Sequence, residues 1–165
     1  MHIEGELYQL GIVVRDLDAA MDHYARLLGV GPFWRLDTDY VARYRDWTGR
    51  VANRNAFAKW GDLYLELIEP GVGHTNAREW LDTKGDGIFH LGYAVDDVSV
   101  LPEGASVCFE SLNKDAPDEP PMVVHLDTAD ELGYFLELAD RRMVEKLNGT
   151  IDAFAASAKA EAREA

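Results

Sequence analysis

The chain has 165 residues, 47% of them hydrophobic, which suits one domain with a proper core and excludes a disordered chain. Its formal net charge of −14 and the lack of a basic stripe in the sequence argue against a nucleic-acid partner. No stretch approaches the ~20 apolar residues that span a bilayer, and the N-terminus lacks a secretory signal pattern, so we expect a cytoplasmic protein with no membrane partner.

The first predicted module covers about residues 6–70 and has the element order β-α-β-β-β. A strand at 8–14, rich in β-branched and aromatic residues, precedes Asp16, which is a suitable N-cap for the helix that follows. Gly29 ends this helix, whose apolar residues recur at helical spacing: Leu17, Ala20, Met21, Tyr24, Leu27 and Leu28. Further strands are expected near 33–37, 51–59 and 62–69. Segment 40–50 fits no single pattern.

The second predicted module covers about residues 87–140, after a linker helix near 75–84. It opens with a strand at 89–95, but the next segment is too short for a full helix and contains Pro102, which argues against one. We therefore predict only a turn or a loop there. Further strands are expected near 106–112, 122–128 and 133–139, with a loop over 111–121. The single cysteine, Cys108, excludes an intrachain disulfide and is predicted to be a small buried residue.

A C-terminal amphipathic helix is predicted at about residues 141–163. Its apolar positions follow i+3 and i+4 spacing: Met143, Leu147, Ile151, Phe154 and Ala158. This stripe fits docking on the chain's own domain or on a second subunit, and both remain open. The pair Asn148-Gly149 interrupts it at a cost of ~1 kcal/mol and allows a kink.

Two segments occur twice in the same order along the chain. Residues 10–17 resemble residues 91–98 at an offset of 81, and residues 64–67 resemble residues 135–138 at an offset of 71. We therefore predict a duplicated module related by a pseudo-two-fold axis.

One repeated strand carries a polar side chain followed by small ones. Because side chains alternate between the faces of a strand, Gln9 shares a face with Gly11. In the second copy, His90 shares a face with Gly92. The opposite face of each strand is bulky and apolar. The small neighbours leave room for something to bind beside the polar group.

The other repeated strand carries a carboxylate among bulky apolar and aromatic residues, Glu66 in one copy and Glu137 in the other. Burying an unpaired carboxylate is costly unless it is paired or bound to a metal. The pseudo-two-fold would bring Gln9, Glu66, His90 and Glu137 together in one cleft. One imidazole nitrogen and three oxygens suit a divalent ion, Zn²⁺ first, with Ni²⁺, Co²⁺, Mn²⁺ or Fe²⁺ as alternatives. Taken singly, each residue also fits a structural role.

At these residues the sequence resembles a known family, the vicinal-oxygen-chelate (glyoxalase/bleomycin-resistance/dioxygenase) superfamily. The resemblance covers about residues 8–139 and rests on these segments: 10–21, 28–33, 65–70, 87–92, 126–128 and 133–138. It is closest to the branch that contains glyoxalase I and methylmalonyl-CoA epimerase. It implies an α+β fold in one domain over residues 1–165, with two paired βαβββ modules forming a cup-shaped mixed sheet, the second helix reduced and a C-terminal helix added.

The resemblance also implies the metal ligands, which fall on Gln9, Glu66, His90 and Glu137. This combination is similar to that of the zinc-type glyoxalase I enzymes. Methylmalonyl-CoA epimerases more often have His at the position of Gln9 and Gln at that of Glu66. Ring-cleaving dioxygenases bind Fe(II) with two His and one Glu, which Gln9 disfavours.

The implied activity is that of a metal-dependent isomerase, epimerase or lyase acting on a small molecule with vicinal oxygens. The metal would stabilise the enolate or enediolate formed when the proton α to a carbonyl is lost. We expect Glu137 to be the general base, with Glu66 as the second choice. Two alternatives stay open: an Fe(II)-dependent dioxygenase, and a non-catalytic binding protein.

Further substrate contacts are expected from four residues: His125, Arg54, Trp60 and Tyr64. His125 lies in a predicted strand and would reach the pocket or fill a sheet face. The aromatic-rich segment 33–64 would supply apolar walls, and arginines within it, such as Arg54, would hold a substrate carboxylate or lie on the surface. We also expect a homodimer, because two small modules forming an open cup would leave strand edges that pairing hides.

Overall fold

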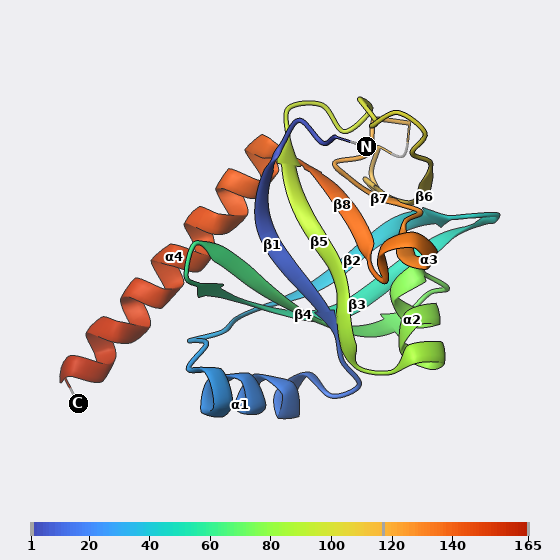
Figure 1. Cartoon of the computed structure of the whole chain (residues 1–165). Coiled ribbons are helices and arrows are strands. Elements are labelled where there is room, and N and C mark those ends of the chain that lie inside the picture. Colours follow the sequence, from blue (N-terminus) through green and yellow to red (C-terminus); the bar gives the residue numbers. More distant parts are fainter. Residues whose placement is uncertain (1, 117, 165) are drawn as a thin grey trace.

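The computed structural model describes residues 2–116 and 118–164, and Figure 1 shows their arrangement. The first module contains these elements: β1 (Glu6–Val13), α1 (Leu17–Leu28), β2 (Trp34–Tyr44), β3 (Trp47–Trp60) and β4 (Leu63–Val72). Helix α2 (Asn76–Lys84) leads to the second module: β5 (Gly87–Val95), β6 (Val107–Leu112), β7 (Val123–Leu126), α3 (Ala129–Leu132) and β8 (Phe135–Asp140). The last element is α4 (Arg141–Glu164).

The eight strands form one mixed sheet that closes on itself in the order β1-β4-β3-β2-β6-β7-β8-β5. In each module the first strand is parallel to the last, β1 to β4 and β5 to β8, and the other neighbours are antiparallel. The modules meet at β1 with β5 and at β2 with β6. The predicted fold is confirmed. Because the sheet closes within one chain, however, the open strand edges on which we based the homodimer do not support it.

Helix α1 begins and ends where the sequence predicts. Asp16 accepts a hydrogen bond from the backbone N–H of Ala19 at 3.0 Å, as an N-cap does. Gly29 adopts the left-handed conformation, with φ of 66°, and ends the helix. The apolar face of α1 packs on β1, β3 and β4 and forms a core cluster with them.

The second module has no counterpart of α1. Residues 97–106 form turns and loop, in agreement with the effect expected of Pro102. Val98 and Leu101 from this segment pack on β5 and β8 in place of a helix. Cys108 is buried, as predicted.

Segment 40–50, which the sequence pattern left ambiguous, is the tip of the long β2–β3 hairpin (Figure 1). The two strands pair without interruption up to Tyr44 opposite Trp47. Arg45 lies in the left-handed region, with φ of 51°. Such tight turns favour Gly or Asn at positive φ, and this one has neither, so the usual hairpin signal is missing.

Helices α2 and α4 lie on opposite sides of the barrel (Figure 1). The stripe of α4 packs on its own chain, where Leu147 and Ile151 contact Phe57 and Tyr64. Helix α2 packs its Trp80 in a core cluster that includes Phe89, Phe109 and Phe135. Helix α4 is continuous through Asn148 and Gly149. None of the described helices is long and apolar enough to cross a membrane.

Candidate functional site

A row of cross-strand partners places Glu66 and His90 on either side of Gly11. In the register of the sheet, Gly11 on β1 is paired with Glu66 on β4 and with His90 on β5. A Cβ atom at position 11 would overlap the His90 imidazole. The absence of a side chain at Gly11 therefore lets the His90 ring lie across β1.

The neighbouring row repeats this arrangement around Gly92. Gly92 on β5 is paired with Gln9 on β1 and with Glu137 on β8. A Cβ atom there would lie 3.0 Å from Glu137 Oε1 and 3.1 Å from Gln9 Cβ. The repeated pattern of a polar residue two positions before a glycine thus has a physical reason, because each glycine clears space for polar side chains of the neighbouring strands.

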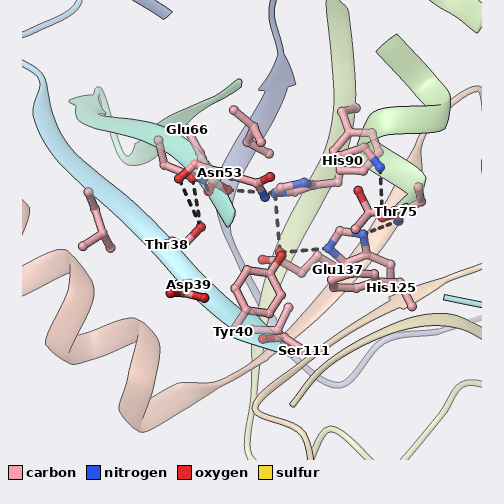
Figure 2. Close-up of a pocket in the computed structure, with 18 of the residues that line it drawn as sticks. Thr38, Asp39, Tyr40, Asn53, Glu66, Thr75, His90, Ser111, His125 and Glu137 are labelled. Atoms are coloured by element: carbon pink, nitrogen blue, oxygen red, sulfur yellow. Dashed lines mark hydrogen bonds and ion pairs between the residues drawn. The ribbon is translucent and has the colours of Figure 1, made fainter. Parts of the chain in front are cut away.

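The side chains of Gln9, Glu66 and Glu137 converge on the Nε2 atom of His90. This nitrogen lies 3.0 Å from Gln9 Oε1. It lies 3.6 Å from Glu66 Oε2 and 3.7 Å from Glu137 Oε2. All four residues are buried, and Figure 2 shows Glu66, His90 and Glu137 facing one pocket. The structure therefore brings together the four residues that the sequence repeat singled out.

Two irregularities in the β1–β5 pairing add residues that sequence reasoning missed. One register shift makes Tyr8 an extra residue beside Gln9, and the Tyr8 hydroxyl donates a hydrogen bond to Glu137 Oε1 at 2.8 Å. The other shift makes Phe89 an extra residue beside His90. Phe89 and His90 both line the cavity that is described below. Strict alternation would turn Tyr8 and Phe89 outward, and a bulge breaks that rule without a clear mark in the sequence.

His125, which we expected as a substrate contact, lines the cavity and contacts Glu137. Its Nε2 lies 3.2 Å from Glu137 Oε2, and its Nδ1 lies 2.8 Å from Asn76 Nδ2. The Asn76 Oδ1 accepts from the backbone N–H of Ala77 at 3.1 Å, which leaves the Asn76 amide N–H to donate to His125 Nδ1. His125 therefore carries its proton on Nε2 and donates it to Glu137.

Among the described residues, one side-chain hydrogen bond reaches Glu66. The Asn55 side-chain amide donates to Glu66 Oε1 at 2.7 Å. Glu137, in contrast, accepts from Tyr8 on one oxygen and from His125 on the other. The two carboxylates are equivalent in the repeat but not in their surroundings.

Burial shifts the pKa values of Glu66 and His90 most strongly, whereas other contacts outweigh it at Glu137. It raises the pKa of Glu66 to about 8, together with repulsion from Glu137. It lowers the pKa of His90 to about 4, so the imidazole is neutral at pH 7. Burial also acts to raise the pKa of Glu137, but the electrostatic influence of His90 and the hydrogen bonds from His125 and Tyr8 outweigh it, and the pKa lies below its usual range.

The donor set has the composition of a divalent-cation site, and its oxygens lie near His90 Nε2. Ligands that share an ion at ~2.0–2.2 Å lie about 3–3.6 Å from one another, and the three oxygens lie 3.0–3.7 Å from His90 Nε2. Nδ1 of His90 has no hydrogen-bond partner among the described residues, so the polar contacts of the ring run through Nε2. Among the described residues, the His and carboxylate ligand atoms that all lie within 4.8 Å of one another belong to His90, His125 and Glu137, and Glu66 is not part of this group.

Glu66, His90 and Glu137 line a cavity of about 370 Å³, and Gln9 lies behind them, outside its lining. β2 pairs with β6 only over its last four residues, from Val41 to Tyr44, so the first half of β2 borders the cavity without a neighbour on that side. Thr38, Asp39 and Tyr40 from this stretch line the cavity (Figure 2).

The other three expected substrate contacts lie outside this cavity. Arg54 pairs with Glu69 at 2.9 Å on the outside of the sheet. Trp60 is 41% exposed at the end of β3. The Tyr64 hydroxyl donates to Asp152 of α4 at 3.0 Å. These residues lie away from the cavity because of where the strands end and where α4 packs. The sequence pattern alone did not predict either position.

Comparison with known proteins assigns the family. A sequence profile of the Glyoxalase/Bleomycin resistance protein/Dioxygenase superfamily matches residues 8–103. The chain belongs to this superfamily. The match spans the whole first module and the start of the second, and so includes Gln9, Glu66 and His90. No curated protein sequence matches this superfamily member significantly.

Solved structures share the fold of this superfamily member. A hypothetical protein from Bacillus halodurans has a TM-score of 0.56 and 19% identity, over 84% of this chain and 95% of its own. A Streptomyces coelicolor methylmalonyl-CoA epimerase in complex with 2-nitronate-propionyl-CoA has a TM-score of 0.54 and 22% identity, over 82% and 96%. The methylmalonyl-CoA epimerase from Mycobacterium tuberculosis has a TM-score of 0.51 and 21% identity, over 85% and 92%. At these identities the likeness concerns the fold alone.

Proposed function

We propose that this protein is a divalent-metal-dependent enzyme that removes and returns a proton α to a carbonyl, as an isomerase, an epimerase or a lyase. The observation that carries the proposal is the convergence of Gln9, Glu66, His90 and Glu137 on one buried point. Two carboxylates share this point, and no Lys or Arg is found among the described residues that line the cavity. A bound cation would balance a charge pair that is otherwise costly to bury.

The four residues would hold the ion through Gln9 Oε1, His90 Nε2 and one carboxylate oxygen each from Glu66 and Glu137. One nitrogen and three oxygens favour Zn²⁺, with Ni²⁺, Co²⁺ and Mn²⁺ as alternatives. When bound, the ion would accept two vicinal oxygens of the substrate and stabilise negative charge on them. Membership of the superfamily and the methylmalonyl-CoA epimerases among the fold neighbours support this class of reaction.

The hydrogen bonds favour Glu66 over Glu137 as the general base, which reverses the order expected from the sequence. Both oxygens of Glu137 accept hydrogen bonds, from Tyr8 and from His125. Such a carboxylate is anchored and weakly basic. Of the residues that the structure describes, only Asn55 donates a hydrogen bond to Glu66. Burial of Glu66 favours its protonated form, so it takes up a proton more readily.

Tyr8, His125 and Asn76 would act through Glu137 by fixing its orientation. Asn76 sets the tautomer of His125, and His125 and Tyr8 then direct one hydrogen bond to each carboxylate oxygen. Hydrogen bonds to a ligand from such neighbours commonly matter 10–100-fold for metal affinity or activity.

A second candidate function rests on His90, His125 and Glu137, whose ligand atoms lie within 4.8 Å of one another. Two histidines and a carboxylate are the ligand set of Fe(II) oxygenases, so an Fe(II)-dependent dioxygenase is the runner-up. The hydrogen bond from Asn76 to His125 Nδ1 argues against it, because a ligating histidine normally donates from its other nitrogen.

Metal analysis of the purified protein tests the proposal. We expect one zinc-class ion per chain in the wild type and in His23→Ala, whose side chain is exposed, and loss of tight binding in His90→Ala. Iron with oxygen uptake would favour the dioxygenase, and equal metal content in the two variants would exclude a site at His90.

A further inference from the structure

The cavity wall around the cluster offers neutral groups for hydrogen bonding. Four elements contribute hydroxyl or amide side chains: Thr38 on β2, Asn53 on β3, Thr75 before α2 and Ser111 on β6. The apolar part of the lining includes the aromatic rings of Tyr40, Phe89 and Phe109, and Tyr40 and Phe109 lie edge to face with their centroids 6.5 Å apart. This wall suits a flat molecule that carries hydroxyl or keto groups.

The arginines that would have held a substrate carboxylate are already paired with carboxylates of the chain. None of them lines the cavity, and each pairs with a carboxylate: Arg43 with Glu110, Arg45 with Glu79, Arg50 with Asp39 and Arg54 with Glu69. At the rim, Asp37 and Asp39 are exposed. Lys114 acts electrostatically on Asp39, as Arg50 does, so these two cations are offset by the rim carboxylates.

The charge of the proposed site sets a further limit. Two carboxylates, Glu66 and Glu137, and one divalent ion sum to zero. When a neutral substrate reacts, its C–H bond breaks, the proton passes to a carboxylate oxygen, and the electron pair stays on the substrate and spreads to its oxygen. The reverse transfer forms the new C–H bond, and no oxidant or reductant is consumed. The net charge of the ion, the two glutamates and the bound substrate therefore stays at zero throughout the reaction. A substrate carboxylate or phosphate would add negative charge that nothing in the described cavity lining balances.

We propose that this site takes a compact, uncharged carbon acid with vicinal oxygens and an apolar ring, and that it does not recognise an anionic thioester. The proposal rests on the function proposed above and names its substrate class. The cavity of about 370 Å³ lies at the small end of ligand sites, which range over ~300–1,000 Å³. The neutral polar wall would bind the hydroxyl or keto groups, and Tyr40 and Phe109 would together form an apolar surface for the ring.

A matched pair of chelating probes tests the proposal. Benzohydroxamic acid is uncharged in neutral solution and presents two vicinal oxygens, and 4-carboxybenzohydroxamic acid differs only by its carboxylate. Both are titrated calorimetrically into zinc-loaded protein whose zinc content is measured before and after. We expect the neutral probe to bind at least about tenfold more tightly, because like charges at an interface oppose binding.

A variant with a positive charge on the cavity wall tests the same preference in the opposite direction. Ser111→Lys places an ammonium on the wall, and we expect it to raise the affinity for the carboxylated probe about tenfold while the neutral probe changes little. Equal or tighter binding of the carboxylated probe by the wild type would overturn the substrate class and leave the metal site intact, as would zinc-loaded protein that binds neither probe. Protein that takes up no zinc would overturn the proposed function and the substrate class with it.

Discussion

Replacing Gly11 by alanine should damage the metal site through one methyl group. The new Cβ would overlap three atoms of the His90 imidazole, so the ring must turn away and Nε2 must leave its 3.0 Å contact with Gln9 Oε1. Gly11 does not need a left-handed backbone, since it is absent from the positive-φ glycines, and the cost is therefore steric. Overpacking of this kind costs ~1–3 kcal/mol in stability. Displacing a ligand should weaken zinc binding by at least the ~10–100-fold known for loss of a supporting contact.

Gly149→Ala in α4 is the matched control. A Cβ there has no neighbour within 4 Å, and alanine gains ~1 kcal/mol over glycine inside a helix. Urea unfolding of the zinc-free proteins and competition with a chromophoric chelator measure the two effects separately. We expect Gly11→Ala to lose both stability and zinc affinity, and Gly149→Ala to gain stability with zinc affinity unchanged. Equal zinc affinity in the two variants would refute the role assigned to the glycine between Glu66 and His90.

Two further predictions concern Glu66, and a third concerns the oligomeric state. Glu66→Gln should slow α-proton exchange of a bound carbon acid by ~10²–10⁴-fold, a larger effect than its effect on zinc content. Deuterium wash-in measures the exchange rate. A larger loss of exchange in Glu137→Gln than in Glu66→Gln would restore Glu137 as the base. Because the pKa of Glu66 is about 8 without metal, zinc uptake should release ~0.9 proton from Glu66 at pH 7 and ~0.1 at pH 9. An indicator dye in weak buffer would detect the released proton. The same proton release in Glu66→Gln would contradict this prediction. The homodimer stays a prediction that now rests on exposed apolar side chains such as Leu27 and Leu28 and not on strand edges, and light scattering that gives only the 18.4 kDa monomer at micromolar concentration would count against it.

The fold and the four central residues of the site could be predicted from the sequence because the module that carries them occurs twice. The repeated strands fixed the pairing of Gln9 with His90 and of Glu66 with Glu137, and strand alternation put all four on inner faces. The sheet register then added what a linear pattern does not contain, namely that Gly11 and Gly92 lie between these residues in two adjacent rows.

The surroundings of the site were not accessible in this way. Tyr8 faces inward because of a bulge, and bulges break the period-two rule on which face assignments rest. Asn76 belongs to a helix between the modules and meets His125 only after the barrel closes. Arg54 and Tyr64 were misplaced because their outward partners, Glu69 and Asp152, are distant in sequence.

Anomalous diffraction at the zinc absorption edge, from crystals of the zinc-loaded protein, tests the central claim most directly. We predict one strong peak per chain, at ~2.0–2.2 Å from His90 Nε2, Gln9 Oε1 and one oxygen of each of Glu66 and Glu137. A peak coordinated by His90, His125 and Glu137 without Gln9 and Glu66, or no peak in this cavity, would contradict it.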